Sequence, residues 1–286
     1  MNTRSEQRRE PIVNLPLVVG ALVAVLFLIH LGRMALPEPI DDYVIGLFAF
    51  APDRYFGEPP GYAPWPGGLA AEIWSPFTYA LLHTNFVHLI SNSVVLAALG
   101  NVLARRTTAV RFFLFVMLMA PVSALGEFAI AFWQSAPVIG ISGVICAFMG
   151  GFARVMFPAE ISPRPMPERT VDVFADEAPD LRSSVSPGAA SSGLVDEGPH
   201  GRRIQRFGPP VAGPLLETLR RPRVLQFIAA FALINILLVF GAPVLVGSGG
   251  AGVAWSVHIA GFIGGFLFWP YFDLVRQRFS SPSNPL

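Results

Sequence analysis

Residues 138–149 read "VIGISGVICAFM" and contain no charged side chain, so this stretch is apolar enough to enter a lipid bilayer. Ser142 lies near its start, with Gly140 two residues before it and Gly143 directly after it. Inside a membrane, serine is most often a small packing residue. The alternative is a nucleophile, and the rest of the sequence has to decide between these two interpretations.

The whole chain has the composition of a membrane protein. Of its 286 residues, 53% are hydrophobic and 14% are charged, and the mean hydropathy is +0.54. A transmembrane helix needs about 20 predominantly apolar residues. Six segments meet this requirement: 12–35, 85–104, 111–134, 138–157, 224–246 and 252–273. We therefore expect an all-α fold, a polytopic membrane protein with a bundle of six transmembrane helices.

The arginines predict the orientation of these helices, because positively charged loops stay in the cytoplasm. All 20 basic residues are arginine, and only Arg33 and Arg54 fall on the side where the fourth span begins. Both termini are therefore expected in the cytoplasm. The chain then forms one membrane domain, whose parts are an N-terminal tail (1–11), four spans (12–157), an inner linker (158–222), two spans (223–273) and a C-terminal tail (274–286).

Two connections between the spans are long. The outer one, 36–84, is rich in proline, glycine and aromatic residues, so we expect it to lie at the membrane interface. The inner one, 158–222, has many prolines, serines and charges without an apolar period, which predicts a disordered linker. The sequence has no glycine-rich phosphate loop and no cysteine–histidine cluster, so we expect no cofactor, no metal and no nucleic-acid partner.

A few polar side chains inside the spans share one depth. Ser142 lies about five residues into the fourth span, roughly 8 Å below the outer surface. His258 lies at a similar depth in the sixth span. A start of the second span at 84–85, where both residues suit an N-cap, puts His88 and Asn92 within two turns of the same surface. As an i, i+4 pair, they also share one helix face.

This set of residues suits acyl transfer. A serine hydroxyl needs a neighbouring base to take its proton, and His258 is the histidine at matching depth in a partner helix. The developing oxyanion needs donors, which His88, the amide of Asn92 and the backbone N–H of Ser142 can supply. The two neighbouring glycines let backbone and substrate approach closely. Because the only acidic residue of the second, fourth and sixth spans is Asp273, at the inner end of the sixth, the arrangement is a dyad and not a triad.

Three motifs resemble those of the rhomboid intramembrane serine proteases. They are "HTNFVHLISN" in the second span, "GISG" in the fourth and "VHIAGFIGG" in the sixth. The resemblance covers about 70–157 and 223–272 and includes the order and spacing of the motifs. It implies a rhomboid-like bundle of six helices.

The resemblance also implies roles for single residues. It makes Ser142 the nucleophile, His258 the general base, and His88 and Asn92 side chains of the oxyanion hole. Supporting positions are Gly140 and Gly143 beside the nucleophile, His83 beneath the outer loop, and Gly261 and Gly265 where the sixth helix packs closely on the fourth. The implied substrates are transmembrane proteins, cleaved near their outer end, with the fifth helix and the outer loop as the gate.

Three positions depart from the family pattern. Trp74 is followed by Ser75 where many bacterial members have arginine, and Ala104 replaces a glutamate at the inner end of the second helix. Cys146 stands where some members have a tyrosine stacked against the catalytic histidine. The resemblance therefore does not say how His258 is held.

Two other functions stay open, a catalytically silent rhomboid-like escort of membrane proteins and a small transporter. A transporter usually has internal symmetry and a site at the membrane centre, whereas here the polar groups gather near one face. Asn235 in the fifth span is interpreted as a packing residue. The expected location is the inner membrane of a bacterium, with the site opening to the periplasmic or extracellular side. The oligomeric state stays open.

Overall fold

The computed structural model describes residues 15–56, 63–130, 137–157, 194–195, 203–204, 212–245 and 254–275. Within these ranges the chain is mostly helical, apart from one short antiparallel pair of strands. In chain order the elements are α1 (Leu17–Met34), α2 (Glu38–Phe48), the 3-10 helix η1 (Pro52–Tyr55), α3 (Gly68–Thr78), the 3-10 helix η2 (Tyr79–Leu81), α4 (Phe86–Ala104), α5 (Ala109–Ile130), α6 (Ser142–Met156), β1 (Leu194–Val195), β2 (Arg203–Ile204), α7 (Leu215–Leu219), α8 (Pro222–Leu245) and α9 (Trp255–Phe272).

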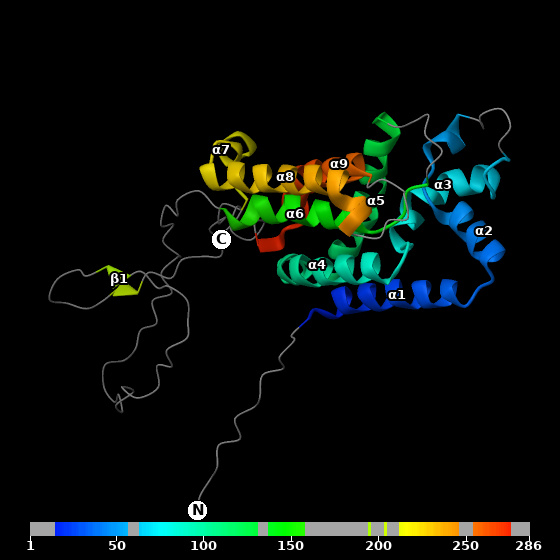
Figure 1. The fold of residues 1–286 in the computed structure, drawn as a ribbon. Coiled ribbons are helices and arrows are strands. Elements are labelled where there is room, and N and C mark those ends of the chain that lie inside the picture. Colours follow the sequence, from blue (N-terminus) through cyan, green and yellow to red (C-terminus); the bar gives the residue numbers. More distant parts are fainter. Residues whose placement is uncertain are drawn as a thin grey trace, which may run out of the picture.

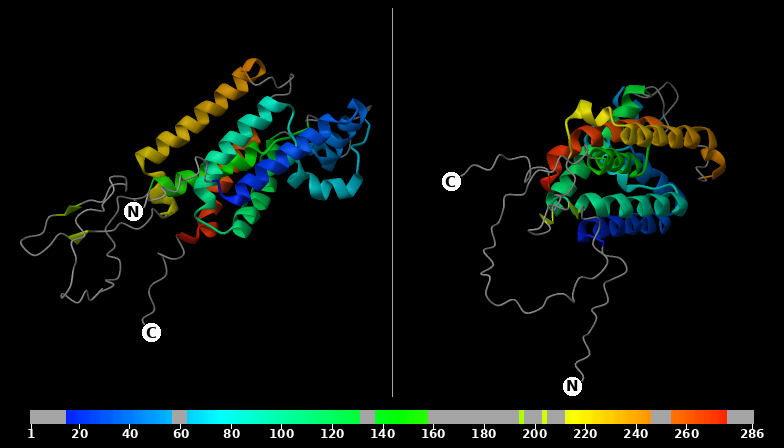
Figure 2. Two further views of the ribbon diagram at one scale, coloured as in Figure 1. Left: turned by 90° about the horizontal axis from the view of Figure 1, so that it is seen from below. Right: turned by 90° about the vertical axis from the view of Figure 1, so that its left-hand side faces the viewer.

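Helix α6 lies at the centre of the helix bundle. In Figure 1 it runs between α4 on one side and α8 and α9 on the other, while α1 packs on the outside of α4. Both views of Figure 2 show α1, α4 and α8 lying along one common direction. The first residues of α4 and α6 lie at the end of the bundle where α2 and α3 are found.

Each of the six predicted spans contains a helix, although the ends differ by a few residues. Three of these helices, α1, α4 and α5, are long and apolar enough to cross a membrane. Helix α6 has 15 residues, and the apolar part of α8 whose side chains are described, Pro222–Leu237, is also shorter. The predicted span residues 12–14, 131–134, 246 and 252–253 lie outside the described part of the chain. Length and composition alone therefore support three of the six spans.

The outer connection 36–84, predicted as a loop, is largely helical where it is described. Its prolines do not prevent this, because Pro39 and Pro52 lie in the first turns of α2 and η1. Proline is suited to that position, where its missing N–H has no acceptor within the helix. On α3, the apolar side chains of Leu69 and Ile73 are exposed four residues apart, so they form one outward apolar face.

Two buried arginines tie the outer connection together and fasten it to α1. Arg33, at the end of α1, donates to both carboxylate oxygens of Asp41 in α2, at 2.7 and 2.9 Å, and to the backbone oxygen of His83 at 2.9 Å. Arg54 in η1 donates to the carbonyl oxygen of Pro66 at 2.7 Å and to a carbonyl of α2. Because a buried charge needs such partners, these contacts fix where the connection lies.

Most of the inner connection 158–222 lies outside the described residues, but its last part is folded. Helix α7 belongs to it, the Thr218 side chain is fully buried, and Ala212 is buried as well. Arg221 donates to the carbonyl oxygen of Phe157 at 2.6 Å. The prediction of a disordered linker up to residue 222 is therefore wrong for residues 212–222. Residues 212–222 are folded because this short stretch makes its own apolar contacts and its own capping contacts.

Helices α6 and α9 pack against each other through glycines. A methyl group on Gly261 would overlap the carbonyl oxygen of Gly143, and one on Gly265 would overlap the carbonyl oxygen of Ala147. The two backbones are therefore in direct contact at both positions. This is the close packing predicted for the fourth and sixth spans.

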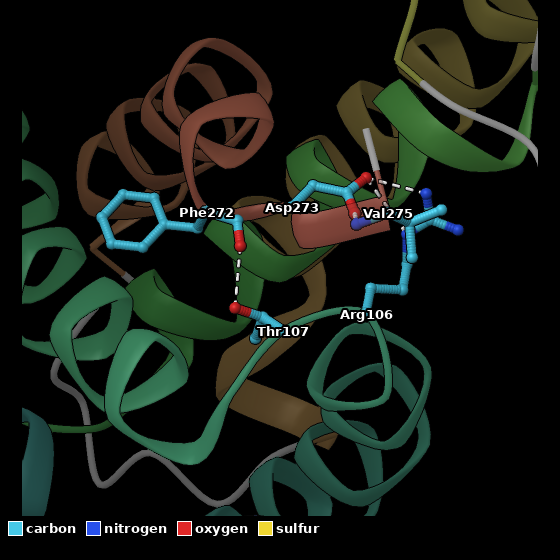
Figure 3. Close-up of polar contacts among 5 residues, drawn as sticks. All are labelled: Arg106, Thr107, Phe272, Asp273 and Val275. Carbon is cyan, nitrogen blue, oxygen red and sulfur yellow. Dashed lines mark hydrogen bonds and ion pairs between the residues drawn. The ribbon is translucent and has the colours of Figure 1, made fainter. Parts of the chain in front are cut away.

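A buried ion pair fastens the opposite end of the bundle (Figure 3). Arg106, between α4 and α5, donates to the Oδ2 atom of Asp273 through Nη2 at 2.7 Å and through Nε at 3.2 Å. The side chain of Asp273 is 0% exposed and that of Arg106 is 10% exposed. Thr107 adds a hydroxyl hydrogen bond of 2.7 Å to the carbonyl oxygen of Phe272. The end of α9 is thereby held to the turn between α4 and α5.

We expect Arg106→Met to lower the free energy of unfolding by about 3–5 kcal/mol, because it leaves a buried carboxylate without its partner. The double variant Arg106→Met, Asp273→Leu removes both charges and should lose clearly less. Unfolding of the detergent-solubilised protein measures both changes. A single-variant loss below about 1 kcal/mol would mean that the pair behaves as an exposed one, contrary to its burial.

Candidate active site

The segment before α6 positions Ser142. Val138 pairs with Phe50 of the outer connection, through N–H···O distances of 2.7 and 3.1 Å. Gly140 donates its N–H to the carbonyl oxygen of Tyr79 at 2.9 Å and has a φ of +116°, a backbone conformation that favours glycine. Ser142 then forms the first residue of α6. The outer connection therefore helps to hold the segment that presents this serine.

His258 lies within hydrogen-bond reach of that serine. The distance between Ser142 Oγ and His258 Nε2 is 2.8 Å, inside the range expected from the sequence. His258 lies in the first turn of α9 and is buried. The glycine contacts between α6 and α9 bring the two residues to this distance.

The second ring nitrogen of His258 has a partner that the sequence analysis missed. His258 Nδ1 lies 2.9 Å from Oδ1 of Asn235 in α8, and Asn235 Nδ2 donates to the carbonyl oxygen of Phe231 at 2.8 Å. An amide oxygen can only accept, so His258 carries its proton on Nδ1. The lone pair of Nε2 therefore faces Ser142. The only signal in the sequence was an amide within an apolar span.

Helix α4 brings two further predicted residues to the same place. Asn85 caps the helix by accepting from the N–H of His88 at 2.9 Å, as the predicted start requires. A Cβ atom built on Gly140 would lie 2.8 Å from His88 Nε2 and 3.7 Å from Asn92 Nδ2. His88 and Asn92 therefore border the segment just before Ser142.

Both side chains can present N–H groups to this segment. His88 Nδ1 lies 3.1 Å from the Thr84 hydroxyl, and when that hydroxyl donates, the ring proton stays on Nε2. Asn92 Nδ2 is buried and has no hydrogen-bond partner in the part of the chain that the structure describes. The Ser142 N–H belongs to the first turn of α6, where N–H groups lack an acceptor within the helix. Donors of this kind can stabilise a developing negative charge.

His83 lies behind His88 and not beside Ser142. Its ring centroid is 5.0 Å from that of His88, in an edge-to-face arrangement, and its side chain is fully buried. Burial, followed by the nearby His88 and His30 imidazoles, lowers the pKa of His83 to about 3. The ring is therefore neutral at physiological pH and supports the position of His88.

Other polar groups of the spans lie elsewhere. Glu127 in α5 accepts a hydrogen bond from the hydroxyl of Ser256 in α9, so it is used in helix packing. Cys146 is buried in an apolar cluster with Phe262 and Phe266. Within the described ranges, no three His, Cys, Asp or Glu side chains gather in a way that could hold a metal ion.

Comparison with known proteins adds the family. Residues 70–180 match the family model of the Rhomboid domain. The chain therefore contains a match to the Rhomboid domain. This match and the apolar helices support an integral membrane protein. Rhomboid proteins act on transmembrane substrates within the bilayer, although inactive members exist. No curated protein matches the chain.

The matched residues include α4, α5 and α6, and with them His88, Asn92 and Ser142. Helices α8 and α9 lie beyond the match, which therefore does not include His258 or Asn235. The family match and the geometry around His258 are thus independent observations.

Proposed function

We propose that this protein is an intramembrane serine endopeptidase with a Ser142–His258 dyad. The observation that carries the proposal is the 2.8 Å contact between Ser142 Oγ and the unprotonated Nε2 of His258. His88 and Asn92, beside Gly140, supply oxyanion donors on the same side of the segment. A nucleophile, a base and an oxyanion site are the parts that acyl transfer requires.

Formation of the acyl-enzyme follows from this geometry. His258 Nε2 takes the proton of Ser142 Oγ as that oxygen bonds to the carbonyl carbon of the scissile peptide. The carbonyl oxygen becomes an oxyanion and accepts from the Ser142 N–H, His88 Nε2–H and Asn92 Nδ2–H. When the tetrahedral intermediate that carries this oxyanion collapses, the C–N bond breaks and His258 gives its proton to the leaving amine.

Hydrolysis then repeats these steps with water. Water attacks the ester carbon and gives a proton to His258 Nε2, and the oxyanion forms again in the same donor set. Its collapse breaks the bond to Ser142 Oγ and releases the carboxylic acid end of the product. The proton on His258 returns to Oγ, which restores the dyad.

The proposed topology has six spans, formed by α1, α4, α5, α6, α8 and α9. In this topology the 15 residues of α6 cover about 22 Å of a hydrocarbon core of about 30 Å. Ser142, at its start, therefore lies several Å inside the membrane. Water has to reach it from the nearer surface.

The arginine distribution supports an outward-facing site, with both termini in the cytoplasm. We place the protein in the inner membrane of a bacterium. The exposed apolar face of α3 fits an outer connection that lies at the membrane interface. Transmembrane proteins are then cleaved near their outer end, with α8 and the outer connection as the gate.

A silent escort is the main competing function. It requires no nucleophile–base contact, so the short distance between Ser142 and His258 favours the protease. The buried Asn92 Nδ2, which has no hydrogen-bond partner among the described residues, favours it as well. A small transporter fits less well, because these polar groups gather at one end of the bundle.

The test is cleavage of a single-pass membrane protein in proteoliposomes by wild type and Ser142→Ala. We expect Ser142→Ala to lose at least about 10⁴-fold in rate, since the nucleophile is gone, with an unchanged unfolding temperature. Mass spectrometry should place the cut in the outer part of the transmembrane segment. The control Ser93→Ala removes another buried serine hydroxyl, from α4, and should cleave like wild type. Substrate binding without cleavage by every variant would instead show an escort, and solute uptake a transporter.

A further inference from the structure

We infer that Asn235, carried by the gate helix α8, positions the base His258 by accepting a hydrogen bond from its Nδ1. This inference rests on the proposed function, because it gives His258 the role of base. It goes further in naming what orients His258 and in coupling that orientation to the position of α8.

Asn235 is the inward-facing residue of its part of α8. Its neighbours Leu233, Ile234, Ile236 and Leu237 are 53–60% exposed, whereas Asn235 is 7% exposed. Burying an amide in an apolar helix is costly unless its polar atoms are hydrogen-bonded. Here Nδ2 bonds within α8 and Oδ1 bonds to His258. The amide is thereby held in one orientation, with its acceptor toward the imidazole.

This orientation selects the ring tautomer that the dyad needs. The Asn235 acceptor holds the His258 proton on Nδ1 and leaves Nε2 free to take the Ser142 proton. A third group that orients the base is the general form of such sites. An amide does this without adding a charge, which would be costly in a membrane. Cys146, where some family members have a tyrosine, offers no ring to hold the imidazole.

Helix α8 packs on α9 through aromatic side chains, with the ring centroids of Phe231 and Phe262 4.3 Å apart. An apolar cavity of about 770 Å³ lies along α8 and α9, lined by Ile228, Phe231, Asn235, Ile259, Phe262 and other residues. Because a hydrogen bond of this kind extends to only about 3.2 Å, a small outward displacement of α8 separates Asn235 from His258. Opening of α8 to admit a substrate therefore releases the base, and its return orients the base again.

The first test is the tautomer of His258, read from ¹⁵N spectra of histidine-labelled protein and assigned by comparison with His258→Gln. Wild type should show the proton on Nδ1. Asn235→Leu removes the acceptor while keeping a side chain of similar size. It should show the proton on Nε2 of His258, or a mixture of the two tautomers. Asn235→Asp keeps an acceptor oxygen and should retain the proton on Nδ1. The control Ile234→Leu, at the exposed neighbouring position, should match wild type. An unchanged tautomer in Asn235→Leu would overturn the inference.

The second test is kinetic. Asn235→Leu should lower kcat by about 10- to 100-fold, the worth of one well-placed hydrogen bond, with KM changed less than about threefold. Asn235→Asp should recover most of that loss, whereas a purely structural amide would show no such rescue. Wild-type kcat in Asn235→Leu, or equal losses in both variants, would overturn the inference. A tautomer that responds to Asn235→Leu in a protein without any cleavage would support the positioning and reject the protease.

Discussion

His258→Gln is expected to lower kcat/KM for a transmembrane substrate by about 10⁴- to 10⁶-fold. Glutamine keeps polar atoms beside Ser142 and Asn235 but cannot accept the serine proton. The residual rate is therefore expected to come from substrate binding and the oxyanion donors, without help from a base. Initial rates in proteoliposomes, with the unfolding temperature measured in parallel, provide the comparison.

The matched control for this variant is His30→Gln. His30 is also a buried histidine, but it lies in α1 with its ring against Phe86. Its replacement should leave the chemical step unchanged. If His258→Gln retained more than about a tenth of the wild-type rate, His258 would not act as the base.

Asn92→Ala is expected to lower kcat by about 10²- to 10³-fold, the usual loss of one oxyanion donor. KM should change little, because the amide acts on the charge that develops during the reaction. Stability should change little as well, since Nδ2 has no partner among the described residues and its removal breaks no hydrogen bond there. Kinetics and unfolding have to be measured on the same preparations.

Asn101→Ala is the control in the same helix, at the other end of α4, where Asn101 accepts from Arg105 at 2.8 Å. It should leave kcat unchanged. If Asn92→Ala instead lost stability in proportion to activity, Asn92 would be a packing amide that joins helices.

The shared depth of the polar residues in the second, fourth and sixth spans could be predicted, because the depth of a residue follows from its position along its helix. The capping residue Asn85 fixed where α4 begins, and the 3.6-residue period then placed His88 and Asn92 on one face. The resemblance to the rhomboid proteases implied that Gly261 and Gly265 would lie against α6. These are local features, so a single sequence carries them.

Other features depend on which segments meet in space. Asn235 faces His258 because of the way α8 is rotated about its own axis. The residues around Asn235 are apolar without a period, so the sequence does not show which face of α8 points inward. The partners of Arg33 and Arg106 lie in other elements, so neither arginine could be told from a topology determinant. The helices of the outer connection were missed because prolines were interpreted as loop signals, although two of them lie in the first turns of helices.

The most direct test of the central claim, that Ser142 is a nucleophile activated by His258, is labelling with a fluorophosphonate. The folded wild type, Ser142→Ala and His258→Gln are treated in detergent, and the modified residue is identified by mass spectrometry of peptides. We expect one label, on Ser142, in the wild type and none in either variant. Folded wild type that stays unlabelled at Ser142, or a label that persists in Ser142→Ala, would contradict it.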